Sequence, residues 1–351
     1  MANKRAKYRP RRLAAPTLHV ISLPQPPLTS PFQIGDVHVS NRVLLAPLAG
    51  IGNWFVRLQA RRHGAGLAVS EMVSSVALAR GNRRTREEML RIHPDEHPVA
   101  IQLFGADPEA IATAAEIVAA AGADLIDLNF GCPVPKVRKT GAGAALLRDH
   151  DRALAIARAA ARPGLPVTAK LRSGVGPGDR AGFDLAVRLA DEAGVAALGF
   201  HPRPAANRHA GAPDYELARE LVERVRVPVV LSGGLASADA ARAAYERSCA
   251  AAVMLARGAL GDPWVFERLL GGRRVPLAPG EIVDEVLWTL DRAEEHWGAE
   301  RAGRNLRRLY PYYLERLGVR GPAADAFQRA DGLGRVRVML EGLRGPVPLA
   351  A

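Results

Sequence analysis

Leu-Ile-Asp-Leu-Asn-Phe-Gly-Cys-Pro, residues 125–133, is the stretch of this chain that points most directly to its fold. Its first four residues form a short apolar run that predicts a buried strand. The turn that follows holds the thiol of Cys132 at the end of that strand, where barrel enzymes place reactive groups. Lys136 and Lys139 come next, and cations near a thiol tune its pKa and attract anions. Taken alone, Cys132 fits an unreactive buried cysteine equally well.

Similar strands recur on both sides of this stretch and alternate with Ala-rich helical segments. Eight strands separated by helices predict a closed, parallel α/β barrel of the TIM (β/α)8 type. A hairpin over 32–39 is expected to close the bottom of the barrel. The strands that we predict are 43–46, 67–70, 99–103, 125–128, 167–171, 197–200, 229–231 and 252–255, and the clearest helices are 108–121, 151–161, 183–193, 214–224 and 238–246.

The chain is longer than one barrel requires, and its character changes near both ends. Residues 1–30 are basic and then Pro-rich, so we expect a flexible arm. Residues 31–272 carry the barrel pattern. Residues 273–351 show helical periodicity over 281–300, 301–317 and about 324–341, and they predict a small all-helical domain that mixes arginines with tyrosines.

The composition favours an anionic partner. The formal net charge is +12, which favours nucleic acid over a membrane surface. A genome composition that favours Arg codons would give the same net charge. The two cysteines form no disulfide framework, and no apolar run is long enough to cross a bilayer. The histidines show no metal-ligand spacing, so we expect no metal. A reducing, cytoplasmic location and a monomer are the expectations.

Polar or glycine-rich residues follow nearly every predicted strand. Because the strands of a barrel are parallel, these residues meet at one mouth. The Gly233-Gly234 and Arg257-Gly258 pairs follow the last two strands, where barrels bind phosphate groups. A phosphorylated cofactor or substrate is therefore expected. The full set is Pro47, Leu48, Ala49, Gly50, Glu71, Gln102, Asn129, Cys132, Lys170, Arg172, His201, Arg203, Ser232, Gly233, Gly234, Arg257 and Gly258.

Several of these segments together resemble one family, the tRNA-dihydrouridine synthases, and within it the bacterial DusB-like branch. The resemblance extends from about residue 32 to 270 and continues into the tail, where RNLRRLYPYYLERLG (304–318) is similar to the family's helical RNA-binding domain. The barrel segments that carry it are APLAG (46–50), SEMV (70–73), IQLFG (101–105), DLNFGCP (127–133), GAGAALL (141–147), AKLRSG (169–174), LSGG (231–234) and ARGALGDPWVF (256–266).

The resemblance implies an FMN enzyme that reduces uridines in tRNA to 5,6-dihydrouridine with NADPH as reductant. Hydride would pass from reduced FMN to C6 of the base, and Cys132 would protonate C5. The cofactor-binding residues implied are Pro47, Leu48, Ala49, Gln102, Lys170, His201, Ser232, Gly233, Gly234, Ala256 and Arg257, and the substrate-binding residues are Asn129, Arg172, Arg203, Lys136 and Lys139.

The chain departs from the family pattern after the sixth strand. There it reads His201-Pro202-Arg203-Pro204-Ala205, without the usual Thr and following Arg. Two other functions stay open. One is an FMN barrel that acts on a free pyrimidine, of the dihydroorotate or dihydropyrimidine dehydrogenase type, although neither the net charge nor the Arg/Tyr-rich tail is explained by it. The other is an RNA-binding protein without catalysis.

Overall fold

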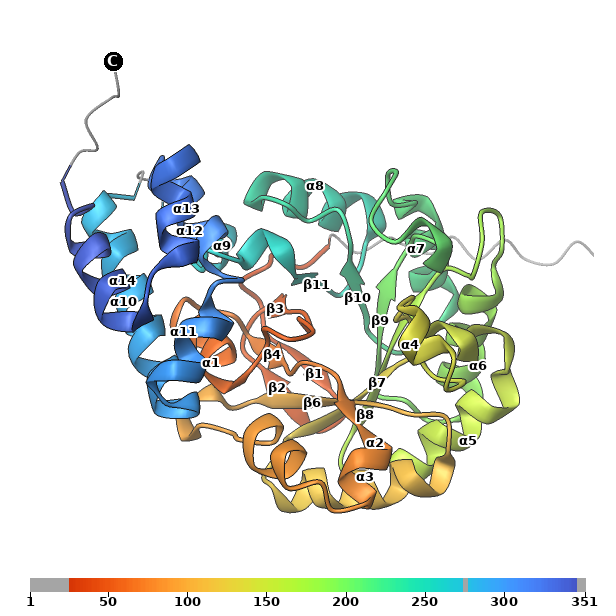
Figure 1. Cartoon of the computed structure of the whole chain (residues 1–351). Helices are drawn as coiled ribbons and strands as arrows, with labels where there is room; N and C mark the ends of the chain where they lie inside the picture. Colours follow the sequence, from red (N-terminus) through yellow and green to blue (C-terminus); the bar gives the residue numbers. More distant parts are fainter. Residues whose placement is uncertain (1–24, 274–276, 346–351) are drawn as a thin grey trace, which may run out of the picture.

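Eight parallel strands close into a barrel in the computed structural model, which describes residues 25–273 and 277–345 (Figure 1). Pairing of β4 with β6 and of β11 with β3 completes the ring, which confirms the predicted fold class. A further strand that we did not predict, β5 (Val73–Ser74), pairs with β6 at the mouth. The barrel strands are β3 (Val43–Leu45), β4 (Leu67–Val69), β6 (Val99–Phe104), β7 (Leu125–Asn129), β8 (Val167–Arg172), β9 (Ala197–His201), β10 (Val229–Ser232) and β11 (Ala252–Leu255).

Helices surround the strands, and the main apolar core lies between the two layers. Asp107 caps α3, since its carboxylate accepts a hydrogen bond from the Glu109 N–H at 3.2 Å. The helices of this part are α1 (Trp54–Arg62), α2 (Ser75–Ala79), α3 (Pro108–Ala120), α4 (Pro135–Arg138), α5 (His150–Ala160), α6 (Ala181–Glu192), α7 (Tyr215–Arg224), α8 (Ala238–Ser248) and α9 (Val265–Leu269).

The barrel interior changes from apolar to polar along the strands. Near the amino ends, inward side chains such as Leu44, Ala100 and Leu125 form a separate apolar cluster. The antiparallel hairpin of β1 (Phe32–Ile34) and β2 (Val37–Val39) packs against this cluster, as predicted for the barrel bottom. Towards the carboxyl ends the register places Gln102 beside Asp127, Asn129 beside Lys170, and Arg172 beside His201. Polar chemistry is therefore confined to the mouth.

The tail holds five helices within its described residues, where the sequence pattern predicted three. Pro311 lies in the first turn of α12, and a proline cannot continue a preceding helix, so the segment expected over 301–317 divides into α11 and α12. Ala330 and Asp331 separate α13 from α14, which begins at Gly332 with a φ of +77°. The five are α10 (Pro279–Trp297), α11 (Ala299–Leu306), α12 (Tyr310–Arg316), α13 (Gly321–Arg329) and α14 (Gly332–Glu341).

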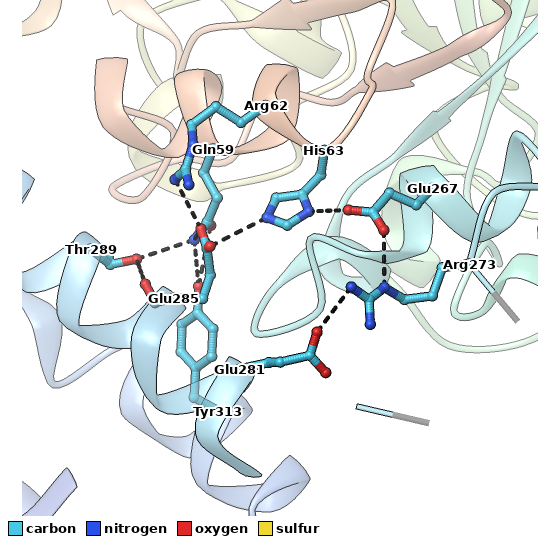
Figure 2. Close-up of polar contacts among 9 residues, drawn as sticks. All are labelled: Gln59, Arg62, His63, Glu267, Arg273, Glu281, Glu285, Thr289 and Tyr313. Carbon is cyan, nitrogen blue, oxygen red and sulfur yellow. Dashed lines mark hydrogen bonds and ion pairs between the residues drawn. The ribbon is translucent and has the colours of Figure 1, made fainter. Parts of the chain in front are cut away.

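A buried polar cluster joins the tail to α1 of the barrel (Figure 2). The Gln59 side-chain amide donates to Glu285 at 2.8 Å and to the Thr289 hydroxyl at 3.1 Å. The same amide group meets the Tyr313 hydroxyl at 2.9 Å, so one barrel side chain contacts both α10 and α12. Because all four groups are buried, breaking one contact leaves unpaired polar atoms. This cluster fixes where the tail lies on the barrel.

An ion-pair chain extends the same cluster towards α9 (Figure 2). His63 lies between Glu267, 2.6 Å from Nδ1, and Glu285, 3.4 Å from Nε2. Glu267 in turn pairs with Arg273, which reaches Glu281 on α10. Although burial opposes it, hydrogen bonds from His63 and Gln59 hold the pKa of Glu285 below its usual value. Glu285 therefore stays charged in this interface.

The predicted amino-terminal arm falls mostly outside the described residues. Its last residues, 25–30, contact the barrel: the Gln25 amide donates to the carbonyls of Tyr245 and Ala250, and Leu28 is buried. Among the helices of the described ranges, none combines the length and apolar character that crossing a membrane requires.

Candidate functional site

A cavity of about 1100 Å³ opens at the carboxyl ends of the barrel strands. The side chains converge there because each follows or ends a parallel strand. Fifteen of the seventeen residues that the sequence singled out for catalysis or binding line it, and they come from the strands of the barrel and the loops after them. They are Pro47, Leu48, Ala49, Gln102, Asn129, Cys132, Lys170, Arg172, His201, Arg203, Ser232, Gly233, Gly234, Ala256 and Arg257.

Lys136 and Lys139 do not line this cavity. They lie on the short helix α4 and at its end, beyond Cys132, where both are exposed. The cavity therefore does not include them, and their tuning of the thiol stays a prediction. The cations whose pKa responds to Cys132 are Lys170 and Arg172, which lie on the adjacent strand. A role for the two lysines in contacts outside the cavity stays a prediction.

A chain of hydrogen bonds positions Cys132. The buried Asp127 carboxylate accepts from the Gln102 amide at 2.6 Å and from the Thr168 hydroxyl at 2.5 Å. Gln102 then accepts from the Asn129 amide at 2.8 Å, and the Asn129 oxygen accepts from the Cys132 N–H at 2.9 Å. Because an ionised carboxylate only accepts, it fixes which end of each amide points where. The orientation of the Cys132 turn is thus set from the barrel interior.

Burial and neighbouring charges shift the pKa values of the ionisable groups around these hydrogen bonds, so that their charged forms are less favoured. Burial raises the pKa of Asp127 to about 6, against the hydrogen bonds from Thr168 and Gln102. Burial, followed by the neighbouring Arg172, lowers the pKa of Lys170 to about 8. Burial and then Arg203 lower the pKa of Arg172 to about 10. The described residues that line the cavity include no Asp or Glu, so its net charge is positive.

His201 is a neutral hydrogen-bond acceptor in this setting. Burial first, and then the charges of Lys170 and Arg172, lower its pKa far below the usual value for histidine. Its Nε2 lies 3.3 Å from the Arg203 guanidinium, which donates. A neutral imidazole can accept that bond, whereas an imidazolium cannot. His201 therefore helps to place Arg203 rather than adding a further charge.

The loops after β10 and β11 pack so closely against the protein at their glycines that no side chain fits there. A Cβ on Gly233, where φ is +97°, would lie 2.2 Å from the His201 ring, and one on Gly234 would lie 2.4 Å from the Tyr215 hydroxyl. A Cβ on Gly258 would lie 2.4 Å from a backbone carbonyl. With Arg257 exposed beside them, these loops combine glycine backbone with a cation, as phosphate sites require.

The sequence analysis missed several side chains that line the cavity, among them Met72, Arg208, His209, Met254 and Tyr312. Met72 follows a predicted strand end, so it could have been included from the sequence. In the structure its sulfur lies 3.7 Å from the Asn129 amide. Arg208 and His209 lie well beyond the end of β9, and only the return of their loop brings them to the mouth. The His209 ring lies near His201, with centroids 6.5 Å apart.

The tail forms part of the rim. Tyr312 of α12 lines the cavity, and Arg308 donates to the Gly50 carbonyl at 2.8 Å. The Gly50 N–H in turn donates to Glu71 at 2.8 Å. Burial raises the pKa of Glu71, against this hydrogen bond. The loop after β3 is therefore held between the barrel and the tail, so the position of the tail affects the shape of the mouth.

Comparisons with known proteins agree with this arrangement. The family model described as "Dihydrouridine synthase (Dus)" matches residues 44–331. The tRNA-dihydrouridine synthase B of Pseudomonas aeruginosa is 36% identical over 303 residues, which cover 84% of this chain and 89% of that protein. A probable tRNA-dihydrouridine synthase of Mycobacterium tuberculosis is 35% identical over 338 residues, 90% of this chain and 85% of that protein.

Among solved structures, morphinone reductase shares the fold, with a TM-score of 0.53 and 19% identity over 73% of this chain and 93% of that one. Low identity restricts that likeness to the fold. The family match extends from the first barrel strand into the helical tail and includes every residue that we found lining the cavity. This chain therefore belongs to the dihydrouridine synthase family.

Proposed function

We propose that this chain is a flavin-dependent oxidoreductase that reduces uridines of tRNA to 5,6-dihydrouridine, with FMN as cofactor and NADPH as reductant. The observation that carries the proposal is the meeting of Cys132, Lys170 and the two glycine-rich loops in one cavity. The names of the relatives support the substrate. The reductant rests on the family resemblance.

The residues present fit a flavin mononucleotide. The cavity exceeds the volume that a single small ligand needs, and it leaves room for a substrate base. Gly233, Gly234 and Arg257 would bind the phosphate, since they offer backbone N–H groups and a cation. Lys170 would hold negative charge at the N1–O2 edge of the reduced ring, and Gln102 would hydrogen-bond the ring. When bound and reduced, the flavin supplies the hydride.

The chain's own residues would then manage charge and protons. Addition of hydride at C6 of uracil places enolate-like charge on the base, which Lys170 and Arg172 would stabilise from the adjacent strand. Asn129 holds the Cys132 turn through the Cys132 N–H, so the thiol meets the base in one orientation. The thiol would donate its proton to C5 and become a thiolate, which solvent reprotonates. Hydride and proton together complete the reduction.

The surface fits an RNA substrate. The net charge of +12 and the arginines of the tail provide electrostatic affinity for phosphates. Tyr312, which lines the cavity from the tail, offers an aromatic face to a base. A uridine must leave its stack to reach the bottom of the mouth, and bases in tertiary loops leave most easily. Binding should therefore weaken steeply as salt rises.

Visible spectroscopy of the purified protein tests the proposal. We expect a flavin spectrum that bleaches when NADPH is added without oxygen and recovers when unmodified tRNA follows. Recovery with a free pyrimidine but not with tRNA would instead support the free-base alternative. A protein that stays colourless when FMN is supplied would leave only RNA binding, and the proposed reduction would be refuted.

A further inference from the structure

Arg208 adopts a backbone conformation that favours glycine. Its φ of +48° and ψ of −95° lie outside the regions open to residues with a Cβ. In the described ranges, Cys249 is the other residue besides glycine with positive φ, and it has the milder left-handed conformation at the end of α8. Strain of this kind persists only where the surrounding structure enforces it, and it clusters at sites that bind ligands.

The surrounding loop holds Arg208 in this conformation. The N–H groups of Ala205 and Ala206 donate to the carbonyls of Gly174 and Val175, both at 2.8 Å. Further along the loop, the buried Arg203 side chain donates to the Gly211 carbonyl at 3.0 Å. Contacts on both sides of Arg208 therefore fix the path of the chain, and the loop returns to the mouth with this residue at its turn.

Arg208 lines the cavity and is exposed. Arg172 and Arg203, which also line it, donate to the Pro204 and Gly211 carbonyls. Within the described part of the chain, the Arg208 side chain has neither a hydrogen-bond acceptor nor an ion-pair partner. Since no carboxylate of the described residues lines the cavity, an anion from outside is the partner that its charge can meet.

Two kinds of phosphate could reach the mouth under the proposed function, on which this inference rests. The glycine-rich loops and Arg257 already serve the phosphate of a mononucleotide. A polynucleotide brings further phosphates beside the nucleoside that enters the cavity, and these stay at the exposed rim. We propose that Arg208 binds a backbone phosphate of the RNA strand next to the inserted nucleotide, and that its strained backbone aims it there.

Two variants separate the charge from the strain. Arg208→Ala and Arg208→Gly both remove the guanidinium, but glycine adopts the observed φ freely. We expect the tRNA affinity of both to fall about tenfold or more, and the log–log salt slope to fall by about 0.7, as expected for one lost phosphate contact. Arg208→Gly should melt about 1–4 °C above Arg208→Ala.

Matched controls lie at the other end of the barrel. Arg226 is an exposed arginine that precedes β10, so Arg226→Ala should leave tRNA affinity unchanged. Cys249→Gly relaxes a positive φ far from the mouth and should also leave binding unchanged. Retained affinity in both Arg208 variants would overturn the inference, as would loss of FMN affinity in place of tRNA affinity. A wild-type protein that does not bind tRNA would overturn the proposed function as well.

Discussion

Replacing Asp127 with Asn removes one buried charge and leaves the shape of the site intact. The side chain is only 3% exposed. It lies at the interior end of the series of hydrogen bonds that runs through Gln102 and Asn129 to Cys132. The new amide can still accept from Gln102 with its oxygen. Its nitrogen can donate to the Thr168 hydroxyl, which accepts as well as it donates. The protein should therefore fold.

The expected gain in stability follows from the pKa of the carboxyl group. Burial raises it from 3.8 to about 6 in the folded protein, which corresponds to roughly 3 kcal/mol. The folded state binds the Asp127 proton more tightly than the unfolded state does. As pH rises from about 4 to about 6, loss of this proton therefore lowers the free energy of unfolding. The penalty stays constant above that pH. An asparagine at this position carries no such penalty.

Urea unfolding at two pH values measures the effect. Relative to wild type, D127N should gain roughly 1.5 kcal/mol more at pH 7.5 than at pH 5, because most other groups titrate alike in both proteins. Turnover should nevertheless fall, since an amide no longer dictates the orientation of Gln102. If the stability difference between D127N and wild type does not change between pH 5 and pH 7.5, then a buried, titrating carboxylate does not anchor these hydrogen bonds.

A second variant checks the role of Thr168. In a Thr168→Val background, the amide nitrogen introduced by D127N has no hydroxyl to donate to and stays buried and unpaired. That costs about 1–3 kcal/mol. With Asp127 in place, Thr168→Val instead removes a charge-assisted hydrogen bond, which is roughly twice as strong as a neutral one, so Thr168→Val should cost more stability in the wild type than in D127N. Simple additivity of the two changes would show that the contact at 2.5 Å does not carry the effect.

Three further predictions concern the mouth. Cys132→Ala should retain FMN and lose at least about a hundredfold in turnover, measured as dihydrouridine formed per enzyme, and wild-type turnover would refute proton donation by the thiol. Activity that needs the Lys170 ammonium should decline as pH rises through about 8, and Lys170→Met should abolish that limb of the pH–rate profile. Gly233→Ala should lower FMN content and destabilise the protein by about 2 kcal/mol or more, because its Cβ would meet His201, whereas Gly122→Ala, at a similar φ of +92° in open space, should keep its FMN.

Local sequence patterns were sufficient for the barrel and for most of the mouth. Each strand is a short apolar run, and each polar strand end follows it directly. Closure of parallel strands then brings Gln102, Lys170 and His201 together, whatever the detailed packing. Lys136 and Lys139 are near Cys132 in sequence, but they lie on α4 and at its end and do not line the cavity. Proximity along the chain does not determine the direction of a side chain.

The tertiary structure decided what depends on contacts between distant segments. Asp127 is one polar residue in an apolar strand by sequence, and only the register with β6 and β8 makes it the anchor for Cys132. Arg208 lies in a loop that is brought to the mouth by hydrogen bonds from Ala205 to the Gly174 carbonyl and from Arg203 to the Gly211 carbonyl. Tyr312 reaches the cavity because the Gln59 cluster fixes the tail. Sequence determines elements through local periodicity, whereas these positions depend on hydrogen bonds that form only once the whole chain has packed.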